Sequence, residues 1–153
     1  MRLAIALAAL AFTAAPAPAS AATSDWRADG NAICADYFDE VAVFLGAVGD
    51  SPTPDLLNGM ARLTERKDGR LARVRPPASK SGRFADMLRH DRRGAHALRQ
   101  VARAMIHGDA SDFDRLLSRY DRETKAFVEL ARGLRLNTCA GGGDAPTGPA
   151  VEL

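Results

Sequence analysis

The chain has 153 residues, of which 46% are hydrophobic and 26% charged, and its formal net charge is +2. This length fits one domain that is large enough to bury a hydrophobic core. No apolar run reaches the about 20 residues that are needed to cross a bilayer, which argues against a transmembrane protein.

Residues 1–21 have the layout of a secretory signal peptide. Arg2 gives a positive start, an apolar run from Leu3 to Ala15 follows, and two prolines precede the small residues Ala19-Ser20-Ala21, the expected cleavage site. The alternative is a hydrophobic helix belonging to the fold itself. We expect an exported protein, in the periplasm or outside the cell, whose folded domain spans residues 22–139.

Four segments show the apolar spacing of three to four residues that is typical of amphipathic helices. They begin near Asp25, Pro54, Ser81 and Ser111, and they end near Val48, Val74, His107 and Leu134. In the first segment the apolar stripe consists of Ile33, Tyr37, Val41, Phe44 and Val48. Short connections between helices favour neighbours that run antiparallel. The predicted fold is therefore an all-α, antiparallel up-down-up-down four-helix bundle.

Two helix starts carry capping signals. Thr53 offers a hydroxyl cap with Pro54 at the first helical position, and Ser111 with Asp114 resembles a capping box. The second helix also contains a conflict, because its apolar period places Lys67 on the inner face. Either the helix breaks at Asp68-Gly69, or Lys67 runs its stem along the core and reaches water. We favour the break.

Cys34 and Cys139 are the only cysteines in the chain. In an exported protein such a pair is most simply read as one disulfide. An antiparallel bundle would bring the end of the last helix back to the start of the first, where these residues lie. Two free thiols or a redox pair are the alternatives, although the Cys-x-x-Cys spacing of redox pairs is absent. We predict a disulfide that joins the first helix to the segment after the fourth.

No motif for catalysis, a metal or a cofactor occurs in the sequence. His90, His96 and His107 lack the spacing that places two imidazoles on one ion, and no Glu-x-x-His is present, which argues against a di-iron bundle. No Cys-x-x-Cys-His, nucleophile elbow or phosphate-binding loop is present either. The sequence thus predicts surface histidines and a protein that is not an enzyme and has no metal or cofactor.

Charge is distributed unevenly along the chain. Residues 25–55 hold seven acids and one base, whereas residues 62–93 hold eleven bases and four acids. One interpretation is a basic surface around the turn between the second and third helices, which binds lipid headgroups, cell-wall polymer or an acidic protein. Its candidate residues are Arg66, Arg70, Arg73, Arg75, Arg83, Arg89 and Arg93. The alternative is that these bases complement the acidic first helix. Nucleic acid is not expected, because no aromatic residues interleave the bases.

The overall layout resembles that of small exported helical-bundle proteins of bacteria. The features that carry the resemblance are the leader, Cys34 early in the first helix, the Pro76-Pro77 turn and Cys139 after the last helix. It implies no functional residues. Residues 140–153 are rich in Gly, Pro and Ala and are expected to be disordered. The leading hypothesis is a non-enzymatic binding or interaction module, and the alternative is a small-molecule or metal carrier with a pocket between helices.

Overall fold

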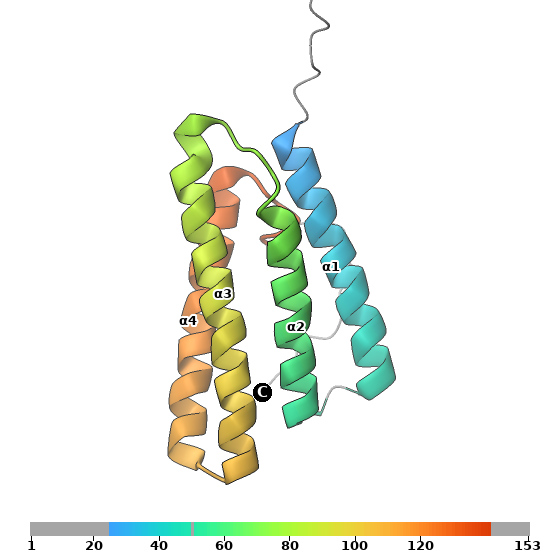
Figure 1. Ribbon diagram of the computed structural model, residues 1–153, viewed down its shortest axis with the longest axis vertical. Helices are drawn as coiled ribbons and strands as arrows, with labels where there is room; N and C mark the ends of the chain where they lie inside the picture. The colour runs from blue at the N-terminus through green and yellow to red at the C-terminus, as the bar shows by residue number, and fades with distance from the viewer. Residues whose placement is uncertain (1–24, 50, 142–153) are drawn as a thin grey trace, which may run out of the picture.

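The computed structural model describes residues 25–49 and 51–141, which form an all-helical fold (Figure 1). Its helices are α1 (Trp26–Val48), α2 (Pro54–Leu71), α3 (Ala78–His107) and α4 (Ala110–Leu134). The predicted signal peptide and residues 142–153 of the predicted tail lie outside the described residues. None of the four helices is long and apolar enough to cross a membrane.

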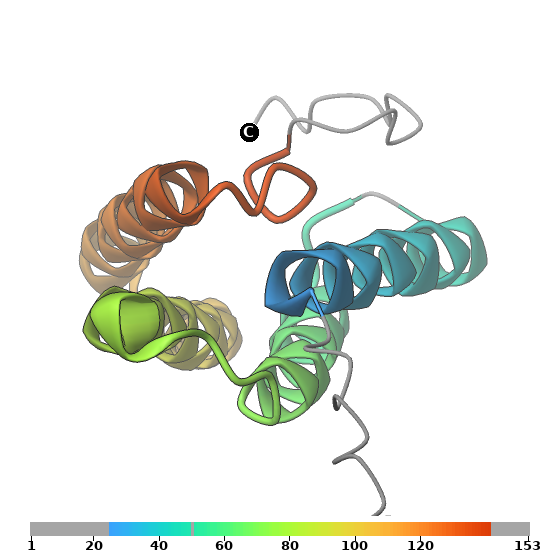
Figure 2. The ribbon, with the colours of Figure 1, turned by 90° about the horizontal axis from the view of Figure 1, so that it is seen from above.

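The helices run up, down, up and down, as predicted, but the bundle is closed unevenly. α2 packs against both α1 and α3, and α3 packs against α4. In the described part of the chain, the backbones of α1 and α4 do not approach each other closely, although the Arg27 side chain reaches the last residue of α4. Seen from above in Figure 2, the segment that follows α4, residues 135–141, lies between these two helices. One side of the bundle is thus closed by an irregular segment instead of a helix contact.

Local capping explains where the helices begin. The Thr53 hydroxyl accepts a hydrogen bond from the Leu56 amide at 3.1 Å, which confirms the predicted start of α2. The predicted capping residue of α4 was wrong. Asp109 caps this helix by accepting from the Asp112 amide, and the Ser111 hydroxyl donates to Asp109 instead.

The helices on either side of the proline turn differ from the prediction. α2 does not break at Asp68-Gly69 but continues to Leu71, whose fully buried side chain fixes the last turn in the core. α3 begins at Ala78, earlier than the predicted Ser81. Pro77 caps it, and the Pro77 carbonyl accepts from the amides of the next turn. The rigid prolines therefore lead directly into a helix.

The predicted disulfide between Cys34 and Cys139 is present, with a Cα–Cα distance of 5.1 Å. Two hydrogen bonds reinforce the same connection. The Thr138 amide donates to the Asn31 side chain at 3.0 Å, and the Arg27 side chain donates to the Leu134 carbonyl at 3.0 Å. Residues 135–141 are consequently attached to the first half of α1.

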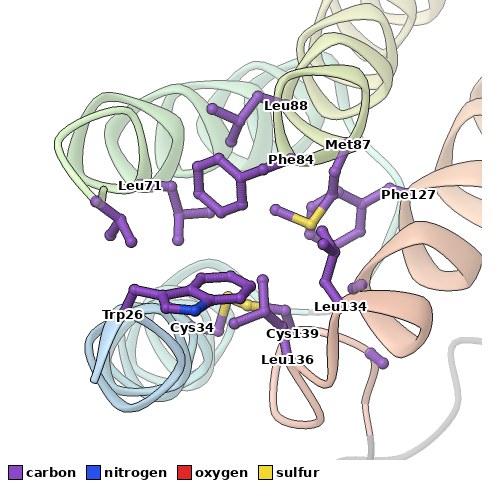
Figure 3. Close-up of a cluster of buried hydrophobic side chains, with 13 residues drawn as sticks. Trp26, Cys34, Leu71, Phe84, Met87, Leu88, Phe127, Leu134, Leu136 and Cys139 are labelled. Atoms are coloured by element: carbon purple, nitrogen blue, oxygen red, sulfur yellow. A yellow bond between two sulfur atoms is a disulfide. The ribbon is translucent and has the colours of Figure 1, made fainter. Parts of the chain in front are cut away.

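The largest hydrophobic cluster surrounds this connection (Figure 3). The Trp26 ring meets the Phe84 ring edge to face, with centroids 6.1 Å apart. Leu136 is fully buried, and it can approach α1 closely because residue 30 is a glycine. A Cβ atom at Gly30 would lie 2.8 Å from a Leu136 methyl group. The start of α1 is therefore packed tightly into the core.

The second half of α1 is held differently. The Phe44 ring lies directly on the backbone of α2 at Gly59, where a Cβ atom would come within 2.1 Å of the ring. Val48, which was predicted to face inward, is 53% exposed because this end of α1 has only α2 beside it. Gly59 is thus the position that allows α1 to contact α2 closely.

We predict that Gly59→Ala lowers the free energy of unfolding by about 1–3 kcal/mol, because the added methyl group overlaps Phe44 and displaces its ring. Gly69→Ala is the matched control on the same helix. Nothing lies within 4 Å of its added Cβ, so the substitution should stabilise the protein by up to about 1 kcal/mol. Urea denaturation of both variants measures the difference, and equal stabilities would contradict this packing.

Candidate functional site

A cavity of about 300 Å³ lies between the helices. All four helices contribute to its lining, together with the end of the 135–141 segment. The polar side chains around it are Tyr37, Thr64, Lys67, His90, Asp91, Tyr120 and Thr124. Phe38, Phe127 and Val128 supply apolar surface, and both disulfide cysteines reach it. The cavity therefore combines apolar walls with several hydrogen-bonding groups.

The cavity occupies a polar layer between two hydrophobic clusters. Leu71 of α2 and Met87 of α3 belong to the largest cluster. One or two turns further along the same helices, Ala61 and Ala95 belong to a second cluster. Lys67 and Asp91 lie between these positions on their helices. The core is thus interrupted at this level, and the interruption contains the cavity.

Lys67 is the centre of the polar layer. Its side chain is only 5% exposed, and its ammonium nitrogen lies 2.6 Å from a carboxylate oxygen of Asp91 on α3. The same nitrogen lies 4.4 Å from the centre of the Tyr37 ring and 4.5 Å from that of Phe127. A buried ammonium group needs such a counter-charge, and the aromatic faces add attraction. Both sequence interpretations of Lys67 were therefore wrong, since it neither ends the helix nor reaches water.

Asp68 adds a second carboxyl group to this layer. Neither of its oxygens meets a hydrogen-bond donor among the described residues, and Arg92 approaches no closer than 3.8 Å. Burial and, to a smaller extent, the neighbouring Asp91 carboxylate together raise the pKa of Asp68 to about 8. At neutral pH Asp68 is therefore mainly protonated, and its hydroxyl can donate a hydrogen bond to Asp91.

The tyrosines contribute neutral hydroxyl groups. Burial raises the pKa of both Tyr37 and Tyr120 above that of an ordinary tyrosine. The Thr64 hydroxyl donates to the Met60 carbonyl at 3.0 Å, so Tyr37 must be the donor in its 3.3 Å contact with Thr64. The Tyr37 oxygen consequently keeps its capacity to accept a hydrogen bond from a molecule in the cavity.

The histidines divide into two groups. His96 and His107 are exposed, as the sequence predicted. His90 is half-buried at the cavity, and its Nδ1 lies 2.7 Å from a carboxylate oxygen of Glu123 on α4. This contact links α3 to α4 beside the cavity.

Arg66 and Arg70 face the acidic first helix. Arg66 pairs with Glu40 at 3.1 Å, and Arg70 pairs with both Glu40 and Asp36. These two basic residues of α2 thus pair with acids of α1, as the alternative interpretation of the charge distribution expected.

The other candidate arginines are spread over the proline turn and α3. Arg89 pairs with Asp86 at 2.8 Å, and Arg75 donates to backbone carbonyls of its own turn. The Arg83 guanidinium lies beside Gly133 of α4. Arg73 and Arg93 are exposed. None of the seven arginines lines the central cavity.

No protein-family model, curated protein or solved structure matches this chain. Sequence reasoning missed the pair of Lys67 and Asp91, although a signal for it exists. Asp91 falls between Leu88 and Ala95 on the inner stripe of α3, just as Lys67 falls on the inner stripe of α2. Opposite charges at inner positions of consecutive helices indicate a buried ion pair.

The protonation of Asp68 gives a prediction about stability and pH. Asp68 keeps its proton in the folded protein up to about pH 8 but loses it near pH 4 when unfolded. Its contribution to the free energy of unfolding therefore falls as pH rises from about 5 to 8, by at most about 1.4 kcal/mol per pH unit. Asp68→Asn, which resembles the protonated form, should remove this fall.

Urea denaturation at a series of pH values measures the effect. Asp121→Asn on the exposed surface of α4 is the matched control and should retain the pH dependence of the original protein. The same pH dependence in Asp68→Asn and in the original protein would contradict a buried, protonated Asp68.

Proposed function

We propose that this protein is an exported, non-enzymatic binding protein whose internal cavity takes up a small neutral molecule. The observation that carries the proposal is the cavity itself, where polar groups from all four helices meet apolar walls. Its volume lies at the lower end of the about 300–1,000 Å³ that is typical of ligand pockets. Helical bundles commonly build their sites in this place, from side chains on facing helices.

The balance of charge inside the cavity favours a neutral ligand. Lys67 and Asp91 already neutralise each other, and Asp68 does not line the cavity. A charged ligand would lose its hydration without finding an unpaired counter-charge, which is costly. A molecule with an apolar ring and one hydroxyl group could instead contact Phe38 or Val128 and donate to the Tyr37 oxygen. Small phenols and aromatic alcohols have this chemistry.

Entry is favoured from the side where α1 and α4 do not pack together. Cys139, Ala140 and Gly141 line the cavity there, so the 135–141 segment covers the site. Thr124 of α4 and Gly141 at the end of the segment are the exposed lining residues, so a molecule would enter beside the disulfide-bonded segment without displacing it.

The proposed location is the periplasm or the outside of the cell, after removal of the signal peptide. The disulfide supports this location, because such bonds persist in oxidising compartments and are rare in reducing ones.

We predict that phenol and benzyl alcohol bind the oxidised protein, whereas benzoate and benzylamine bind at least about tenfold more weakly because each carries an uncompensated charge. Thr124→Trp should abolish binding, since Thr124 is an exposed residue at the cavity and a large ring there fills it. Titration calorimetry or NMR chemical shifts provide the measurement.

Lys125→Trp is the matched control, because it places the same ring on α4 at an exposed position that does not line the cavity. It should bind both neutral probes as the original protein does. Failure of both neutral probes to bind, or equal loss of binding in the two tryptophan variants, would contradict the proposal.

A second candidate function is contact with an anionic surface or an acidic protein through the basic residues. It is supported by Arg73 and Arg93, which are exposed and form no ion pair within the described residues. Binding to vesicles with anionic lipid headgroups, or to cell-wall polymer, should weaken with added salt and in the variant Arg73→Gln/Arg93→Gln. Binding that is insensitive to both changes would exclude this electrostatic contact.

A further inference from the structure

The second half of α1 leaves apolar side chains exposed. Residues 41–49 carry no charged or hydrogen-bonding side chain, so this part of the helix is apolar on all sides. Helices of that kind are normally buried. Yet the Val43 side chain is 76% exposed and the Val48 side chain 53% exposed. Figures 1 and 2 show why, since this end of α1 stands away from α3 and α4 and has only α2 beside it.

A groove of about 660 Å³ runs between this end of α1 and the facing part of α2. Val43, Phe44 and Leu63 provide its apolar surface. Its two walls carry opposite charges, with Asp39 on α1 and Arg62 on α2. Neither of these two forms an ion pair within the part of the chain that the structure describes, whereas their neighbours Glu40 and Arg66 pair with each other. The groove thus has an apolar floor, one unpaired acid and one unpaired base.

We propose that this groove binds a second copy of the same chain, which forms a twofold-symmetric dimer. Two identical grooves can face each other in two symmetric ways. A twofold axis perpendicular to the helices would place α1 of one copy on α1 of the other, so that the acidic walls of the two grooves would face each other. An axis parallel to the helices places α1 of each copy against α2 of the other. In that arrangement Asp39 of each copy faces Arg62 of the second copy.

Charge complementarity therefore selects the parallel axis, and the dimer buries the Val43 side chain that the single chain exposes. The Val43 side chains of the two copies would lie in the apolar centre of the interface, and the two pairs of Asp39 and Arg62 would lie at its edge. The groove shares no lining residue with the central cavity, so the dimer and the proposed ligand binding can be tested separately.

The test is sedimentation velocity of the oxidised protein over a range of concentrations. The original protein should dimerise, and Val43→Glu should raise the dissociation constant at least about tenfold. Ile106→Glu is the matched control, because Ile106 is 64% exposed on α3 and lies outside the groove. It should leave the dissociation constant unchanged.

A charge exchange tests the orientation of the two copies. Asp39→Arg alone and Arg62→Asp alone each place like charges opposite one another and should weaken the dimer. The double variant Asp39→Arg/Arg62→Asp restores opposite charges across the interface and should dimerise like the original protein. A monomer at all concentrations, a dimer that Val43→Glu leaves intact, or a double variant no stronger than the single ones would overturn the proposal.

Discussion

The disulfide between Cys34 and Cys139 closes a side of the bundle that helix packing leaves open. α1 packs along its length on α2, and its first turn also contacts Phe84 of α3 through Trp26 and the Leu134 carbonyl of α4 through Arg27. The disulfide joins residues 105 positions apart and ties α1 to the segment that follows α4. In the chain-entropy account a loop of this length contributes about 4–5 kcal/mol to stability. Leu136 and Trp26 can then complete the largest hydrophobic cluster.

This arrangement explains why the interior is not uniformly apolar. Where α1 and α4 separate, residues 135–141 close the bundle in place of a helix contact, and the central cavity lies beside this segment. Lys67 and Asp91 fill part of the layer with a paired charge, although an apolar pair of similar volume would commonly give equal or greater stability. The ion pair is therefore weak evidence for stability, and it holds two charges at the wall of the cavity. The same separation exposes the second half of α1, including Val43.

Much of the fold follows from local sequence signals. The apolar period, Thr53 with Pro54, and two cysteines in a chain with an apparent leader predicted the helices, their antiparallel order and the disulfide. The period and the caps depend only on residues that are close in sequence, and two cysteines can form only one intramolecular disulfide. The start of α3 was misplaced because the helix begins directly after Pro77 without a side-chain cap, and the cap of α4 was misplaced because Asp109 accepts the capping hydrogen bond in place of Ser111.

The site was less predictable, because its properties depend on contacts between helices. Lys67 looked like a helix breaker or a surface residue when its helix was considered alone. Its inward position became favourable only through Asp91 on the next helix and two aromatic rings. Likewise, Arg66 and Arg70 formed part of a predicted basic surface, but α1 supplies acids that pair with them. The apolar period of one helix alone does not reveal such an ion pair, because the inner positions of both helices have to be compared.

Hydrogen exchange of the oxidised and reduced protein tests the central claim most directly. If the disulfide closes the open side, reduction should speed amide exchange mainly in the first half of α1 and in residues 135–141. α2 packs against α3, and α3 packs against α4, without help from the disulfide. The amides of these three helices should therefore keep most of their protection from exchange. Unchanged protection in α1, or a loss spread evenly over all four helices, would contradict this account.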